Sequence, residues 1–136
     1  MKSQNKILIV DDSELNRSLL ADMLLDEYEI MEAGNGLQAI KLLEFHRFEI
    51  SLILLDIIMP EMDGFDVLGF MKRRHMTEVI PVIMISSESS SSYIEKAYEM
   101  GAADYISRPF NALIVGRRVI NTLMLYACLL YTSDAA

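Results

Sequence analysis

The apolar run at residues 52–55, which leads into Asp56 and is closed by Met59 and Pro60, constrains the fold more than any other stretch. Four apolar residues without alternation predict a strand that is covered on both faces, as in a parallel sheet. Pro60 ends the strand because it has no N–H to donate. A carboxylate at the end of a buried strand is costly unless its charge is used. Since open α/β sheets bind ligands outside the carboxyl ends of their strands, Asp56 is a candidate site residue.

Strands and helices are expected to alternate along the whole chain. Short apolar or β-branched runs predict strands at residues 6–10, 29–33, 52–56, 82–85 and 103–106. Apolar residues spaced by three and four predict helices at residues 14–27, 37–46, 65–74, 91–100 and 113–126. Short connections between such elements are typical of right-handed βαβ crossovers, so we predict one domain with a doubly wound parallel sheet.

Composition limits the classes of partner. The formal net charge of -8 repels nucleic acid and favours cations, so direct nucleic-acid binding by this domain is not expected. No segment is expected to span a bilayer, and the first residues lack the long apolar region of a signal peptide. The single Cys128 cannot form an internal disulfide. We therefore expect a cytoplasmic protein without membrane contact.

Polar residues follow four of the predicted strands. Asp11 and Asp12 follow the first, Asp56 ends the third, Ser86 follows the fourth and Arg108 follows the fifth. In a parallel sheet all of them emerge at one edge. Three crowded carboxylates repel one another, which favours a hard divalent cation with oxygen ligands, such as Mg²⁺. A cation beside a nucleophilic carboxylate, with a hydroxyl and a guanidinium for the remaining oxygens, predicts phosphoryl transfer to Asp56.

This combination resembles the receiver domain of bacterial two-component response regulators, from residue 5 to about residue 126. The residues that carry the resemblance are Asp11-Asp12, Asp56, Met59-Pro60, Met62-Asp63-Gly64, Ser86-Ser87, Tyr105 and Arg108-Pro109-Phe110. The resemblance implies a flavodoxin-like (βα)5 α/β fold with strand order 2-1-3-4-5. It also implies that a histidine kinase or phosphotransfer protein phosphorylates the domain, which then signals to a downstream effector.

The resemblance assigns roles to the site residues. Asp12, Asp56 and the backbone carbonyl of Ile58 would bind Mg²⁺, and Asp11 would act largely through water. Such a domain is a switch, with at most slow autophosphorylation and autodephosphorylation, and is not an enzyme in the usual sense.

The resemblance also implies switch roles for two further residues. The hydroxyl of Ser86 would bond the phosphoryl group and move toward it, and Tyr105 would turn inward into the space that Ser86 leaves. Partners would read this change on the face of the fourth helix, fifth strand and fifth helix, where a homodimer could also form. Taken alone, Tyr105 is a packing residue, so its switch role depends wholly on the resemblance.

Arg108 departs from the family pattern, which has lysine before the proline. A planar guanidinium suits a phosphate but differs in geometry from an ammonium group, so switching and phosphoryl lifetime are in question. Two alternatives stay open. One is a phosphorylation-independent pseudo-receiver. The other is a Mg²⁺-dependent phosphatase on a similar fold, which needs a second aspartate where Ile58 stands.

The end of the chain has a different character. Residues 127–136 continue no clear amphipathic pattern and read as a non-native or disordered tail after a receiver domain at residues 1–126. Receivers join effectors at this point, so a lost output domain and a stand-alone receiver both fit.

Overall fold

The computed structural model describes residues 5–87 and 91–135. Within these ranges, five parallel strands form one sheet in the order β2-β1-β3-β4-β5. The strands are β1 (Lys6–Val10), β2 (Glu29–Ala33), β3 (Ile50–Asp56), β4 (Val82–Ser86) and β5 (Asp104–Ser107). The helices are α1 (Glu14–Leu24), α2 (Gly36–His46), α3 (Gly64–Arg73), η1 (Met76–Glu78), α4 (Ser91–Glu99) and α5 (Ala112–Ala135). The flavodoxin-like fold class and its strand order are confirmed.

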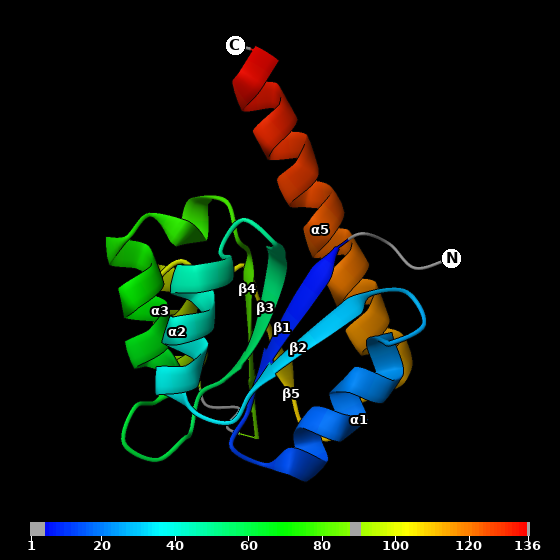
Figure 1. The fold of residues 1–136 in the computed structure, drawn as a ribbon, viewed down its shortest axis with the longest axis vertical. Coiled ribbons are helices and arrows are strands. Elements are labelled where there is room, and N and C mark those ends of the chain that lie inside the picture. The colour runs from blue at the N-terminus through cyan, green and yellow to red at the C-terminus, as the bar shows by residue number, and fades with distance from the viewer. Residues whose placement is uncertain (1–4, 88–90, 136) are drawn as a thin grey trace.

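Helices cover both faces of the sheet, with α1 and α5 on one face and α2 and α3 on the other (Figure 1). Strands β1, β3 and β4 are almost wholly buried, as the continuous apolar runs predict. Successive side chains of a strand point to opposite faces, so each face has its own core. Leu8 and Leu55 belong to the core under α2 and α3, whereas Ile9 and Leu54 belong to the core under α1 and α5.

Three helix starts follow the capping rules. Ser13 accepts a hydrogen bond from the backbone of α1, Asn35 from that of α2, and Asp63 from that of α3. These caps fix where the chain turns from a strand end into the next helix. They therefore fix the loops at the carboxyl edge of the sheet.

Helix α5 differs most from expectation. Its first half packs on the sheet through the buried Val115 and Val119, and its second half projects beyond the sheet (Figure 1). The helix was expected to end near residue 126 but continues through Ala135. No glycine or proline follows Gly116, and alanine and leucine favour the helix. The origin of residues 127–136 stays a prediction.

The same helix corrects the expectation that no segment could span a bilayer. Among the described residues, Ala112–Leu130 is long and apolar enough to do so by length and composition, and 17% of it is buried in the fold. Its first half is a core helix that carries Arg117 and Arg118. A single helix of this kind is weak grounds for a membrane span. The apolar residues in its first half are already explained by packing on the sheet.

Candidate functional site

Three carboxylates meet at the carboxyl edge of the sheet. Asp11 and Asp12 follow β1, Asp56 ends β3, and these two strands are neighbours. Each residue offers a carboxylate oxygen within 4.8 Å of the other two. Asp11 is 0% exposed and Asp56 is 2% exposed, whereas Asp12 faces solvent. The structure thus brings together the three acidic residues that the sequence singles out.

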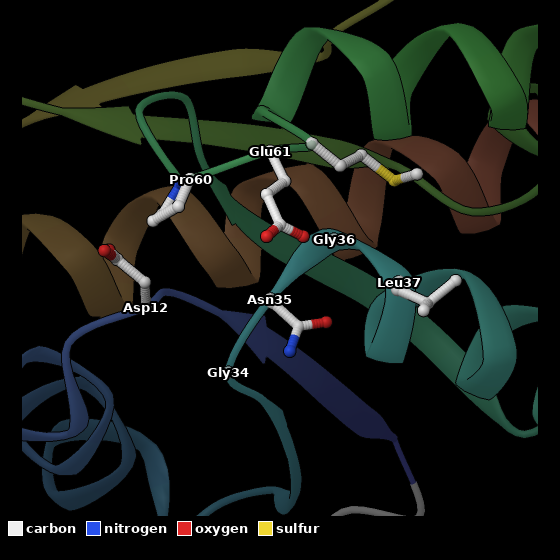
Figure 2. Close-up of a pocket in the computed structure, with 8 residues that line it drawn as sticks. Asp12, Gly34, Asn35, Gly36, Leu37, Pro60 and Glu61 are labelled. Carbon is white, nitrogen blue, oxygen red and sulfur yellow. The ribbon is translucent and has the colours of Figure 1, made fainter.

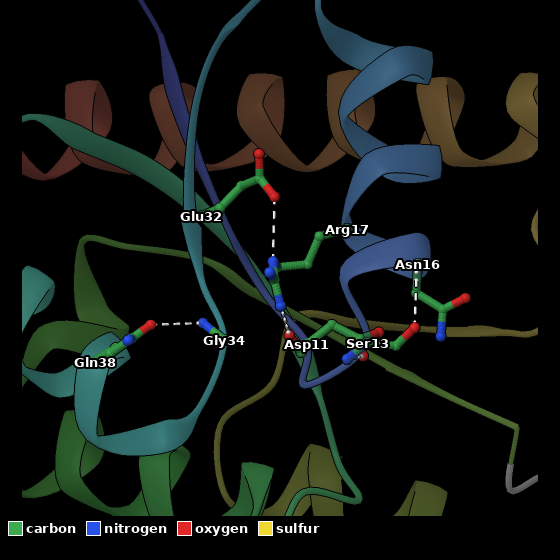
Figure 3. A network of polar contacts seen from close by, with 7 residues as sticks. All are labelled: Asp11, Ser13, Asn16, Arg17, Glu32, Gly34 and Gln38. Atoms are coloured by element: carbon green, nitrogen blue, oxygen red, sulfur yellow. Dashed lines mark hydrogen bonds and ion pairs between the residues drawn. The ribbon is translucent and has the colours of Figure 1, made fainter.

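A network of hydrogen bonds holds the turn after β1 (Figure 3). The backbone N–H of Ser13 donates to Asp11 Oδ1 at 2.9 Å. Arg17 donates from Nη1 to the backbone carbonyl of Asp11 at 2.7 Å and from Nε to Glu32 Oε1 at 3.2 Å. Arg17 therefore ties the acidic turn to the end of β2. Sequence reasoning missed this residue, because the only available signal was an arginine on the first turns of a predicted helix.

The turn after Asp56 is equally constrained. The backbone N–H of Gly64 donates to the carbonyl of Ile57 at 2.7 Å, and a Cβ on Gly64 would lie 2.2 Å from the carbonyl oxygen of Asp56. Asp63 and Asp66 form a capping box at the start of α3. The hydrogen bond from Gly64 to Ile57 and the close approach of Gly64 to Asp56 hold the end of β3 against α3, and the capping box fixes the start of that helix. Asp63 and Gly64 therefore have a structural role.

Arg108 reaches the acidic cluster from the loop after β5. Its Nη2 forms an ion pair with Asp11 Oδ2 and lies 3.5 Å from Asp56 Oδ2. Its backbone N–H donates to the carbonyl of Ser86 at 3.0 Å. Two buried atoms, Asp56 Oδ1 and Arg108 Nε, have no hydrogen-bond partner within the described ranges. The site therefore has one unused acceptor and one unused donor.

The environment of Asp56 disfavours its charged form. Burial is the main cause that raises the pKa of Asp56 from 3.8 to about 6, and the charge of Asp11 adds to it. Arg108 acts in the opposite direction but does not cancel the effect. The donor set is all oxygen, one buried carboxylate oxygen has no hydrogen-bond partner in the part of the chain that the structure describes, and Asp12 is open to solvent. These residues fit a hard divalent cation such as Mg²⁺.

The remaining predicted site residues are Ser86, Tyr105 and Ile58, and their positions in the fold relate them less directly to the acidic cluster. Ser86 is the buried last residue of β4, and it follows Ile85, the register partner of Asp56. Tyr105 on β5 is only 6% exposed, so its ring is already buried before any inward turn. The side chain of Ile58, two residues after Asp56, is exposed. Carbonyl ligation by Ile58 and the switch roles of Ser86 and Tyr105 stay predictions.

A cleft of about 470 Å³ opens beside Asp12 (Figure 2). It is lined by Asp12, Gly34, Asn35, Gly36, Leu37, Pro60, Glu61 and Met62. The cleft lies between the loops that follow β1, β2 and β3. Of the three acids of the cluster, only Asp12 lines this cleft.

The fold and the acidic cluster at the carboxyl edge of its sheet define a class of flavodoxin-like domains with their site at the strand ends. A family model, the response regulator receiver domain, matches residues 7–115, and the chain belongs to this family.

Known proteins resemble the chain in sequence and in structure. It is 39% identical over 108 residues to the transcriptional regulatory protein CpxR of Escherichia coli, covering 79% of this chain and 44% of CpxR. It is 33% identical over 119 residues to the two-component response regulator ORR3 of Oryza sativa, covering 87% of this chain and 90% of ORR3. The solved structure of NtrX from Brucella abortus with ADP matches with a TM-score of 0.89 and 29% identity, over 100% of this chain and 30% of NtrX.

The chain spans only part of several relatives. It covers 44% of CpxR, 26% of a Vibrio cholerae protein named as a probable cyclic di-GMP phosphodiesterase, and 9% of histidine kinase P4 from Formosa agariphila. Receiver domains thus occur in proteins with different outputs. What this chain has in common with these relatives is the receiver domain, a signalling module.

Proposed function

We propose that this chain is a phosphorylation-dependent switch in which Asp56 accepts a phosphoryl group from a histidine kinase or phosphotransfer protein, with Mg²⁺ as the cofactor. The observation that carries the proposal is the buried Asp56, which lies in a cluster of three carboxylates at a strand end and has one oxygen without a hydrogen-bond partner among the described residues. Receiver family membership supports the same chemistry.

The residues divide the work of phosphoryl transfer. Asp12, Asp56 and the carbonyl of Ile58 would hold Mg²⁺, with Asp11 acting through water. The bound ion supplies positive charge to the carboxylates and the phosphoryl oxygens. An oxygen of Asp56 attacks phosphorus while the bond to the donor's imidazole nitrogen breaks, and the electron pair leaves with the imidazole. Burial of Asp56 keeps competing water away from the acyl phosphate.

The rest of the site would hold the product and report it. The Ser86 hydroxyl and the Arg108 guanidinium bond the phosphoryl oxygens. The change then passes through Tyr105 to the face formed by α4, β5 and α5, where a downstream effector or a second copy of the chain binds. We place this switch in the cytoplasm and assign no nucleic-acid binding to the domain itself, in keeping with its charge of -8.

Intact-mass measurement after incubation with Mg²⁺ and a small-molecule phosphodonor tests the proposal. Wild type should gain one phosphoryl group, whereas Asp56→Asn and a Mg²⁺-free sample should gain none. The exposed Asp22 on α1 offers a matched control, so Asp22→Asn should be modified like wild type.

The pseudo-receiver is the alternative that the same measurement identifies. A folded wild-type chain that binds Mg²⁺ but never gains mass would favour it, and Arg108 would be its cause. The phosphatase alternative is disfavoured by Ile58, which stands where that chemistry needs a second carboxylic acid.

A further inference from the structure

Arg108 engages the same carboxylates that a divalent cation would need. Its Nη2 pairs with Asp11 Oδ2, while Asp11 Oδ1 accepts the Ser13 N–H at 2.9 Å. Both oxygens of the fully buried Asp11 are therefore occupied. The same Nη2 lies 3.5 Å from Asp56 Oδ2, so one guanidinium neutralises two of the three acids.

A guanidinium stays charged at every ordinary pH, so it cannot lose its proton to make room for a metal ion. A divalent cation among these carboxylates would lie within a few ångströms of Arg108 and repel it. The same site cannot then hold both cations in their best positions.

We infer that Arg108 is the resting counterion of the acidic cluster, and that a divalent cation binds only as the guanidinium withdraws from Asp11. The inference rests on the metal-binding part of the proposed function. It gives the arginine a role in setting Mg²⁺ affinity, separate from any contact with the phosphoryl group.

The structure provides a place for the withdrawn guanidinium. While it is paired with Asp11, Arg108 Cζ already lies 5.5 Å from the centroid of the Phe110 ring, so a short shift toward this ring would keep the cation over an aromatic face as it leaves the carboxylate. Arg108 also lines a cavity of about 470 Å³ with apolar walls that include Leu19, Pro109 and Phe110. The buried Nε, which has no acceptor among the described residues, is then free to turn toward an incoming anion.

Calorimetric Mg²⁺ titration without phosphodonor tests the exchange. Arg108→Gln should bind Mg²⁺ at least tenfold more tightly than wild type. Arg118→Gln is the matched control, because it removes an equal charge from another ion pair, between Arg118 Nη1 and Asp104 Oδ1 at 2.9 Å. Its effect should stay within twofold. Equal Mg²⁺ affinities for wild type and Arg108→Gln would overturn the inference.

A second variant tests where the guanidinium goes. Phe110→Leu removes the aromatic face, so it should weaken Mg²⁺ binding two- to threefold when Arg108 is present and leave it unchanged in the Arg108→Gln background. An equal effect in both backgrounds would contradict the withdrawal toward Phe110. Absence of Mg²⁺ binding in every variant would overturn the metal part of the proposed function as well, whereas equal affinities overturn the exchange alone.

Discussion

Asp56 shows how a single buried side chain can serve function at the expense of stability. It is 2% exposed, it faces Asp11 and Asp12, and one of its oxygens has no partner among the described residues. Burying a charged carboxylate in such a place costs free energy in the folded state, whereas in the unfolded state the carboxylate is hydrated and no such cost arises. The metal-free domain should therefore show this tension as a dependence of stability on pH.

Because the pKa of Asp56 rises from 3.8 to about 6 on folding, the folded state binds more protons than the unfolded state between these values. The free energy of unfolding should thus fall as the pH rises from 4 to above 6. Asp56→Asn should abolish this fall and be more stable than wild type at pH 7, by about 3 kcal/mol. Urea denaturation of both proteins in the presence of a metal chelator, from pH 4 to pH 8, measures the free energy of unfolding. Parallel pH profiles of wild type and Asp56→Asn would contradict the prediction.

Gly64 is the residue whose size matters most for the geometry of the site. A Cβ there would lie 2.2 Å from the carbonyl oxygen of Asp56, so Gly64→Ala must push β3 and α3 apart. We expect a loss of about 3 kcal/mol in the free energy of unfolding, and weaker Mg²⁺ binding. Gly116→Ala is the control, because nothing lies within 4 Å of its Cβ position on α5. It should gain up to about 1 kcal/mol.

At the scale of elements, the end of helix α3 places one residue in a strained backbone conformation. His75 follows the last turn of α3 with a φ of 60°, a left-handed conformation in which a Cβ is unfavourable. Its side chain is exposed and forms a surface ion pair with Glu78 at 3.5 Å. An exposed ion pair of this kind does not compensate for the backbone strain.

His75→Gly should therefore stabilise the domain by about 1 kcal/mol, because glycine adopts this conformation without strain. His75→Ala keeps the Cβ and loses only the surface contact, so it should change stability by less than about 0.5 kcal/mol. Thermal or urea unfolding of the two variants separates backbone strain from side-chain effects. If alanine and glycine gave the same gain, the backbone explanation would be wrong.

The sequence predicted elements well where local patterns decide them. Apolar runs located the five strands, and the residues that end them located the acidic cluster and Arg108. Contacts between distant segments left no such pattern, so the bridge that Arg17 makes between Asp11 and Glu32 was not predicted. The choice of Asp11 as the main partner of Arg108 also depends on tertiary packing and was not predictable.

At the scale of the whole molecule, the second half of α5 contributes little to the core. Cys128, Leu129 and Leu130 are exposed, whereas Tyr126 still donates from its hydroxyl to the carbonyl of Thr77 at 3.4 Å. We propose that residues 1–126 form the receiver unit and that residues 127–136 are dispensable for its folding.

A chain that ends at residue 126 should unfold within about 1 kcal/mol of the full chain and bind Mg²⁺ with the same affinity. Val119→Ala, at a fully buried position of the same helix, should cost about 2 kcal/mol and shows that the assay detects losses in α5. A truncated chain that fails to fold would contradict the proposal.

The projecting helix also has a mechanical consequence. Helix α5 starts a few residues after Arg108, at the edge of the sheet that carries the acidic cluster, and its 24 residues reach past the opposite edge (Figure 1). A rigid rod of this length, about 36 Å, magnifies motion: a tilt of about 10° at its first turn displaces its far end by roughly 6 Å. A rearrangement at Arg108 that tilts the first turn of α5 by this angle would thus displace the far end of the helix by about the length of a side chain, at a distance where no electrostatic field from the site would be felt.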